Sequence, residues 1–310
     1  KKKRREEEKL MSHLLLNQKS SKGYYSAKAH KQETARDLYR KIFQSTPNKH
    51  RAQKCLVTLG RLGSPAVKVL KAEEIEQLIS LYDENSLQKA FELAQKLTIE
   101  FPRESIPWNI LGATCQKLGQ TEEADTAFRK VILLNPSYAD GHNNLGALLT
   151  QQGRLEEATS SYKEALKINP EDADVFNNLG LVLHQQSKLD QAIEAYKKAI
   201  QIKPHFAEAF NNLGSALSAN KDINRAIDSF CMAVTHDPNL AEASNNLGNA
   251  FHEIGKFESA IDAYRSAITV KSDYAEAYYN MANALQGLGD LEQAIEAYQS
   301  AIDIKPDYAE

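Results

Sequence analysis

Paired asparagines are the most regular chemistry-bearing residues of this chain. They fill two successive positions at a constant spacing: Asn143-Asn144, Asn177-Asn178, Asn211-Asn212 and Asn245-Asn246. Asn109 and Asn280 each fill one of the two positions. A side-chain amide offers two N–H donors and a carbonyl acceptor, so it can pair with a peptide unit whatever the sequence of that peptide. Asparagine is a mediocre helix former, so helix propensity does not account for these residues.

Acidic residues recur four positions before the second asparagine position: Asp140, Asp174, Glu208, Glu242 and Glu276. Such carboxylates could select basic segments of a partner. They would equally stabilise a helix whose first turn they occupy, through its macrodipole. The sequence leaves both interpretations open.

Residues for catalysis or metal binding do not form a pattern. His184 and His252 share one position in the spacing, but no cysteine or carboxylate recurs beside them at ligand spacing. Three distant cysteines (Cys55, Cys115 and Cys231) argue against a disulfide framework and fit a reducing compartment. Phosphate-loop, dinucleotide, nucleophile-elbow and zinc-protease motifs are absent from the sequence. We therefore expect no enzyme activity, metal or cofactor in these residues.

Composition predicts a soluble, folded chain, with 42% hydrophobic and 25% charged residues. Its apolar runs are too short to span a bilayer and it shows no secretory signal, so we expect a cytoplasmic protein. Charge is distributed unevenly, because residues 1–70 contain 18 basic and 5 acidic residues while the remainder is acidic. Two differently charged parts indicate two roles.

A period of 34 residues runs through the acidic part. It aligns a proline column at Pro136, Pro170, Pro204 and Pro238. It aligns Leu-Gly pairs whose glycines are Gly112, Gly146, Gly180, Gly214 and Gly248. It also aligns an alanine column (Ala124, Ala158, Ala192, Ala226, Ala260, Ala294) and an aromatic column (Phe128, Tyr162, Tyr196, Phe230, Tyr264, Tyr298). Such self-similarity is the signature of a repeat protein.

Each unit reads as two amphipathic helices joined by a tight turn. Apolar residues recur at helical spacing, as in Leu145, Leu148 and Leu149. The turn between the helices holds a residue suited to a positive φ: Gly119, Gly153, Gly255, Gly289 or Asn85. The glycine and alanine columns permit close helix contact, and the aromatic column fills the remaining space. A hairpin of this kind buries its apolar face only by stacking on its neighbours.

The pattern Trp108, Leu111-Gly112, Ala124, Phe128, Pro136 resembles the tetratricopeptide-repeat consensus. The repeats are framed as 105–138, 139–172, 173–206, 207–240, 241–274 and 275–308, with a degenerate unit at 71–104 and residues 309–310 beginning another. The resemblance implies an all-α, right-handed superhelical solenoid over residues 71–310. The first helix of each repeat would line its concave groove.

The asparagines are similar to a ladder in the repeat domains of O-GlcNAc transferases, where amides hold the main chain of an extended peptide. By this resemblance the ladder is Asn144, Asn178, Asn212, Asn246 and Asn280, interrupted by Ile110. Its flank would comprise Asn143, Asn177, Asn211, Asn245, Asp174, Glu208 and Glu242. The alternative is that the paired asparagines reflect recent duplication or bond neighbouring repeats. Chaperone-binding repeat domains clamp a carboxylate with Lys and Arg, which the matching positions here lack, so we expect no such clamp.

Residues 1–66 are interpreted as a basic, divergent helical segment that caps the repeats or docks onto a partner. It could instead fold back on the acidic repeats, and the absence of a nucleic-acid-binding motif places nucleic acid last among its targets. The resemblance implies a scaffold or adaptor that binds an extended peptide or a partner protein in its groove. The alternative is the substrate-recognition arm of a larger glycosyltransferase, sulfotransferase or oxygenase with its catalytic domain outside this chain. Self-association through an uncapped last repeat is a third possibility.

Overall fold

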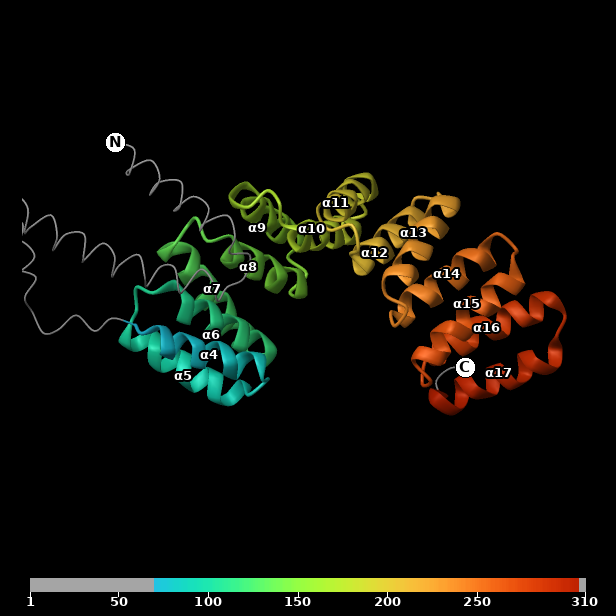
Figure 1. Ribbon diagram of the computed structural model, residues 1–310, viewed down its shortest axis with the longest axis horizontal. Coiled ribbons are helices and arrows are strands. Elements are labelled where there is room, and N and C mark those ends of the chain that lie inside the picture. The colour runs from blue at the N-terminus through green and yellow to red at the C-terminus, as the bar shows by residue number, and fades with distance from the viewer. Residues whose placement is uncertain (1–69, 307–310) are drawn as a thin grey trace, which may run out of the picture. The chain divides into compact units, whose positions relative to one another are not determined.

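The computed structural model describes residues 70–306, and within that range it contains α-helices and no strand (Figure 1). The chain divides into two compact units, Lys1–Leu134 and Asn135–Glu310, which we call unit 1 and unit 2. The predicted basic segment 1–66 and the start of a further repeat at 309–310 lie outside the described residues.

The described part of unit 1, residues 70–134, contains two helical hairpins. Its helices are α4 (Ala72–Asp83), α5 (Leu87–Glu100), α6 (Ser105–Lys117) and α7 (Thr121–Leu134). Leu78, Leu97 and Ile106 are buried together between α4, α5 and α6. Helices α4 and α5 form a hairpin within residues 71–104, while the bounds of that degenerate repeat stay a prediction.

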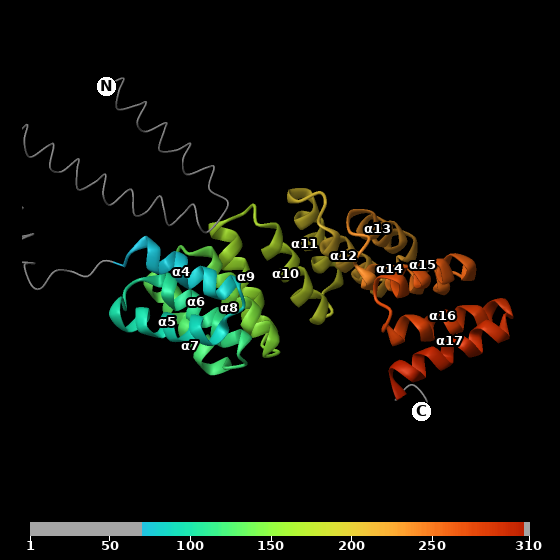
Figure 2. The same ribbon diagram turned by 60° about the horizontal axis from the view of Figure 1, so that its bottom comes forward.

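Residues 135–306 of unit 2 contain five further hairpins. Its first helices are α8 (Ala139–Gln151), α10 (Ala173–Gln185), α12 (Ala207–Ala219), α14 (Ala241–Glu253) and α16 (Ala275–Leu288). Its second helices are α9 (Leu155–Ile168), α11 (Leu189–Ile202), α13 (Ile223–His236), α15 (Phe257–Val270) and α17 (Leu291–Ile304). Each second helix from α9 to α15 packs on the next first helix, and successive first helices also touch (Figures 1 and 2). The prediction of an all-α stack of hairpins is confirmed, and its superhelical handedness stays a prediction.

The turn within each hairpin has the predicted left-handed backbone. Gly119, Gly153, Gly255 and Gly289 have φ between 72° and 83°, and Asn85 has φ of 57°. Ser187 and Lys221 occupy the same position in their repeats with φ of 59° and 64°. The turn geometry is thus kept even where the sequence supplies a side chain that disfavours it.

The glycine column faces the aromatic column, as the packing argument predicts. A Cβ atom built on Gly180 would lie 2.5 Å from Cε1 of Tyr196, and Gly146, Gly214 and Gly248 meet their rings equally closely. Tyr162, Tyr196 and Tyr264 are buried in consequence. In the last repeat the glycine is replaced by Ala282, and the facing Tyr298 is only half-buried. Glycine therefore lets each ring lie against the backbone of the first helix.

Candidate functional site

The five ladder asparagines lie on the first helices of unit 2, one on each of α8, α10, α12, α14 and α16. All five, Asn144, Asn178, Asn212, Asn246 and Asn280, are half-buried. We call the surface that they share with the exposed acidic column the first-helix face. Because successive first helices touch, this surface continues from repeat to repeat within unit 2.

Each of four ladder amides donates a hydrogen bond to the preceding repeat. Asn178 Nδ2 donates to Asn143 Oδ1 at 3.2 Å, and Asn212 Nδ2 donates to Asn177 Oδ1 at 3.0 Å. Asn246 and Asn280 repeat this bond to the Oδ1 atoms of Asn211 and Asn245, at 3.0 and 3.1 Å. The two asparagine columns therefore bond neighbouring repeats, which is the alternative left open by the sequence.

The flanking asparagines lie inside the interface between repeats. Asn177, Asn211 and Asn245 are only 4%, 3% and 1% exposed, whereas Asn143 is half-buried. Asn211 Nδ2 donates to Glu242 Oε1 at 3.5 Å, and Asn245 Nδ2 donates to Glu276 Oε1 at 3.4 Å. Asn211 is thus bonded to both Glu242 and Asn246 on α14. Asn245 is bonded in the same way to Glu276 and Asn280 on α16.

The ladder amides keep hydrogen-bonding capacity after these bonds are formed. One N–H of Asn178, Asn212, Asn246 and Asn280 is used, and a second N–H remains on each. Their Oδ1 atoms accept no hydrogen bond from the residues that the structure describes. The bond to the preceding repeat fixes the orientation of each amide, so the remaining donor and acceptor are held in place.

A further column of the first helices meets the aromatic hydroxyls. Tyr264 Oη donates to Asn249 Oδ1 at 2.8 Å, and Tyr298 Oη donates to Asn283 Oδ1 at 2.6 Å. The same position in repeat 173–206 holds Leu181, and the hydroxyl of Tyr196 is buried without a partner in the described structure. Burial raises the pKa of Tyr196 and of Tyr264 well above the usual range, so both hydroxyls are donors at neutral pH.

Two histidines that the spacing did not connect meet between repeats. His205 Nδ1 lies 3.2 Å from His236 Nδ1, with the rings edge to face, and His236 also packs on Phe210. His236 Nε2 is buried and has no partner among residues 70–306. These histidines lie 31 residues apart in neighbouring repeats, where no shared column marks them. His184 is half-buried on α10, and burial lowers its pKa.

No group of three or more His, Cys, Asp or Glu side chains in the described part of the chain is arranged to hold a metal ion. The helices between residues 70 and 306 are each too short or too polar to cross a membrane.

The comparisons with known proteins agree with this architecture. A family model described as the C-terminal domain of cilia and flagella-associated protein 70, a tetratricopeptide-repeat domain, matches residues 3–237. The chain belongs to this family of tetratricopeptide-repeat domains. Two shorter tetratricopeptide-repeat models match residues 248–289 and 275–308. No curated protein matches the chain.

Many solved structures share the repeat fold. The chain is 26% identical to the MamA protein, covering 55% of this chain and 93% of MamA with a TM-score of 0.50. It is 26% identical to YrrB, described as a tetratricopeptide-repeat protein with an unusual peptide-binding site, covering 59% and 95% with a TM-score of 0.50. A chain of the APC/C hetero-tetramer Cut9–Hcn1 matches at 19% identity, 74% and 45% coverage and a TM-score of 0.61. That last likeness shows the fold alone. Repeat domains of this fold are typically non-enzymatic scaffolds for protein–protein interaction.

The last hairpin has two exposed aliphatic side chains on one helix. Leu291 and Ile295 on α17 are 60% and 68% exposed. They lie one turn apart, so they share one side of the helix. Self-association through this repeat stays a prediction.

Proposed function

We propose that the first-helix face of unit 2 binds the main chain of an extended polypeptide segment. The ladder residues Asn144, Asn178, Asn212, Asn246 and Asn280 would hold it. The observation that carries this proposal is that the ladder amides of α10, α12, α14 and α16 are each fixed by one inter-repeat hydrogen bond while half-buried at the surface. Fixing a donor and an acceptor before binding lowers the entropic cost of the complex.

Repeat spacing fits an extended peptide. Packed helices lie about 8–10 Å apart, and an extended chain rises about 3.3 Å per residue. One ladder amide would therefore meet about every third residue of the ligand. A neutral amide would hydrogen-bond to the peptide unit of the ligand and not to its side chain, so the ladder gives affinity with little sequence preference. The unusual peptide-binding site described for YrrB supports a peptide-binding role for a fold of this kind.

The test is a titration followed by the side-chain amide signals of asparagine in a ¹⁵N–¹H NMR spectrum. The probe is the neutral, end-blocked peptide acetyl-(Gly-Gln-Ala)₅-amide. The single variants Asn178→Ala, Asn212→Ala and Asn246→Ala each remove one pair of NH₂ signals and so assign the ladder. We expect the peptide to shift the ladder signals in the unsubstituted chain. We expect the triple variant to lose about tenfold or more in affinity, since each hydrogen bond contributes about 0.5–1.5 kcal/mol.

The matched control removes three exposed amides from second helices: Gln191→Ala, Asn224→Ala and Gln299→Ala on α11, α13 and α17. This variant should bind the peptide like the unsubstituted chain. Circular dichroism on all variants checks that helicity is kept. A folded ladder variant that binds with unchanged affinity would refute the ladder, as would peptide shifts confined to other residues.

A further inference from the structure

We infer that the segment bound on the first-helix face is basic, with Lys or Arg recurring about every third residue. This inference rests on the proposed function and names the class of its partner. Charge is distributed unevenly between the two sets of helices in unit 2.

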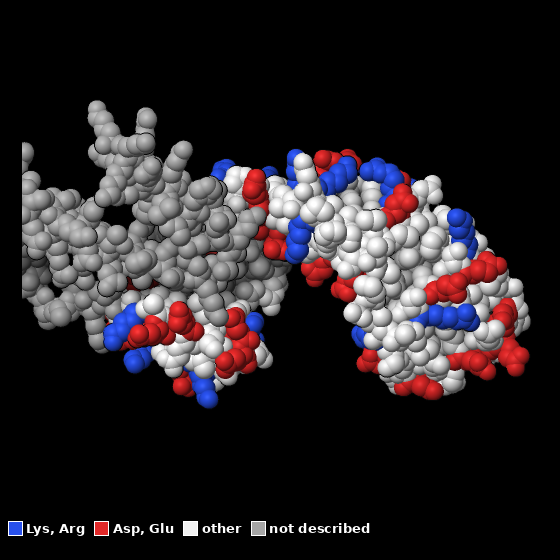
Figure 3. Space-filling view, in the orientation of Figure 1, with Lys and Arg blue, Asp and Glu red and all other residues white. Residues whose placement is uncertain are grey.

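The first helices of unit 2 carry only negative charge. Their sequences contain no Lys or Arg, and their acids are Asp140, Asp174, Glu208, Glu242, Glu253 and Glu276. Basic helical residues of unit 2 are confined to the second helices: Lys163, Lys167, Lys197, Lys198, Arg225 and Arg265. In Figure 3 blue basic side chains lie along the upper edge over α11 and α13, with red acidic side chains among them.

Several acids on the second helices have a cation beside them. Glu164 pairs with Lys167 and Glu194 with Lys197, each at 2.6 Å. On the described first helices of unit 2, the ion pair at 4 Å or less is that of Asp174 with Lys203, at 3.9 Å. Glu208, Glu242 and Glu276 are exposed, and none of the Lys and Arg residues between 70 and 306 lies within this distance of them. The first-helix face therefore presents carboxylates whose charge is not compensated locally.

Two of these carboxylates are also held in position. Glu242 and Glu276 accept from the buried amides of Asn211 and Asn245. Each lies four residues before a ladder asparagine, and residues four apart share one side of a helix. A ligand held by the ladder thus passes one carboxylate per repeat, spaced by about three extended residues. Lys or Arg at that interval would meet successive carboxylates, whereas an acidic segment would be repelled.

A buried hydroxyl lies against α10, since the ring of Tyr196 packs on Gly180. Tyr196 is fully buried and its Oη has no partner, although its counterparts Tyr264 and Tyr298 bond to asparagines of the first helices. An unpaired buried donor lowers folding stability, and native structures contain few of them. At this repeat the face presents Leu181, which is 36% exposed, in place of an amide. We expect an aliphatic part of the ligand there, with the cations along α12, α14 and α16.

The experiment compares three end-blocked peptides on the full chain by isothermal titration calorimetry: acetyl-(Gly-Lys-Ala)₅-amide and its Gln and Glu counterparts. A fourth peptide has the lysine composition of the first with its five lysines contiguous. We expect the spaced Lys peptide to bind about tenfold more tightly than the Gln peptide at low salt, and the Glu peptide to bind least. The preference should shrink as salt rises, because exposed charges are screened.

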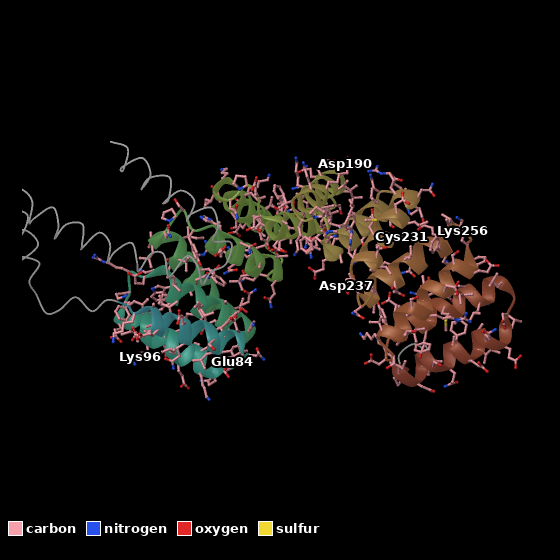
Figure 4. All side chains as sticks on the ribbon, in the orientation of Figure 1. Glu84, Lys96, Asp190, Cys231, Asp237 and Lys256 are labelled. Carbon is pink, nitrogen blue, oxygen red and sulfur yellow. The ribbon has the colours of Figure 1, made fainter. Side chains whose placement is uncertain are left out.

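The decisive variant is Glu208→Gln with Glu242→Gln and Glu276→Gln, which keeps the side-chain acceptors and removes three charges. Its matched control is Asp190→Asn with Glu258→Gln and Glu292→Gln. These are exposed first-turn acids of α11, α15 and α17 with the same net charge and the same place on the helix dipole. Asp190 lies at the edge of α11 (Figure 4). We expect the first variant to lose the Lys preference and the control to keep it.

Each of the other outcomes contradicts either the basic partner or the asparagine ladder. Equal loss in both variants would make the preference an effect of net charge and overturn the inference, as would a contiguous-lysine peptide that binds as well as the spaced one. Undetectable binding of the Lys peptide at low salt would also overturn it. If the Gln peptide shifts the ladder signals and lysine adds nothing, the ladder stands and the basic partner fails. If only the Lys peptide binds and the asparagine variant leaves it unchanged, the acidic selection stands and the ladder fails.

Discussion

At the scale of single residues, the structure shows where the repeat is kept and where it is strained. The left-handed turn is formed by glycine in four repeats but by Ser187 and Lys221 in two others. The ring of the aromatic column is buried in every tyrosine repeat except the last. At each of these two positions some repeats differ from the others. The difference predicts the effect of a substitution there.

Lys221→Gly is expected to stabilise the chain by about 0.5–1 kcal/mol. A side chain in the left-handed region costs about 1–2 kcal/mol, which glycine would relieve. Glycine also makes the unfolded chain more flexible, and this entropy offsets part of the gain in stability. The reverse change, Gly153→Ala, should destabilise by a similar amount. Denaturant unfolding followed by circular dichroism measures both. An unchanged or lower stability for Lys221→Gly would contradict the strain argument.

Tyr196→Phe is expected to leave stability unchanged or to raise it slightly. The hydroxyl that it removes is buried without a partner, so no hydrogen bond is lost. Tyr264→Phe breaks the bond to Asn249 and should cost about 0.5–1.5 kcal/mol. Thermal melts of the two variants side by side test the contrast. Equal destabilisation by both would mean that Tyr196 has a partner after all.

Because of Cys115, the free energy of unfolding is expected to fall as pH rises from about 9 to 11. Burial, and then the charge of Glu123, raise the pKa of this thiol from 9.0 to about 11, against an opposing backbone hydrogen bond. Between these values the unfolded chain has released the proton and the folded chain has kept it, so the free energy of unfolding falls by about 2 kcal/mol by pH 10.5. Cys115→Ala should remove most of this loss between pH 8 and 10.5. A variant with the same slope would show that other groups cause it.

At the scale of elements, the hairpin is fixed by close contact between a glycine and a ring. The ring of Tyr196 lies so near Gly180 that a methyl group would overlap it. Hydrogen bonds such as Asn212 to Asn177 then connect one first helix to the next. Packing thus forms the hairpin, and the amides join one hairpin to the next.

Gly180→Ala is expected to destabilise the chain by about 1–2 kcal/mol. Overpacking costs about 1–3 kcal/mol, and the better helix propensity of alanine offsets up to about 1 kcal/mol. Faster hydrogen exchange should be confined to α10, α11 and the adjoining helices, because coupling in a repeat protein is mostly between neighbours. Ala282→Gly, where the facing ring is only half-buried, is the matched control and should not change exchange in α10 and α11. Uniformly faster exchange along the chain would contradict local coupling.

At the scale of the whole molecule, each unit has buried residues of its own. In unit 1 Leu78, Leu97 and Ile106 are buried together, and in unit 2 Ile261, Tyr264 and Leu285 form a comparable cluster. The candidate site lies wholly in unit 2, since its asparagines and acids all belong to residues 140–280. We therefore expect unit 2 to fold and to bind the peptide without the rest of the chain.

Residues 135–310 expressed alone are expected to fold into a helical, thermally cooperative protein. Each of their hairpins buries its apolar side against neighbours within the same unit. Circular dichroism and one-dimensional NMR measure folding, and titration with the end-blocked peptides measures binding, which should match that of the full chain. A fragment without dispersed methyl signals would show that unit 2 depends on the rest of the chain.

The sequence by itself determined the features that repeat. The period of 34 residues located every hairpin from residue 71 onward, and turn chemistry located the positive φ of Gly119 and Asn85. The small and aromatic columns predicted the contact of Gly180 with Tyr196. These features follow from local helix geometry and from steric volume, which a column of residues expresses directly.

Only the tertiary structure decided how side chains in neighbouring repeats meet. It buried Asn211 and left Asn212 at the surface, although both belong to regular columns. It joined Asn246 to Asn211, brought His205 to His236 and left the hydroxyl of Tyr196 unpaired. These contacts depend on the rotation of one hairpin relative to the next, which sums the packing of many side chains and is expressed by no single column. The proposed face therefore follows from a pattern in the sequence and from an orientation set by the fold.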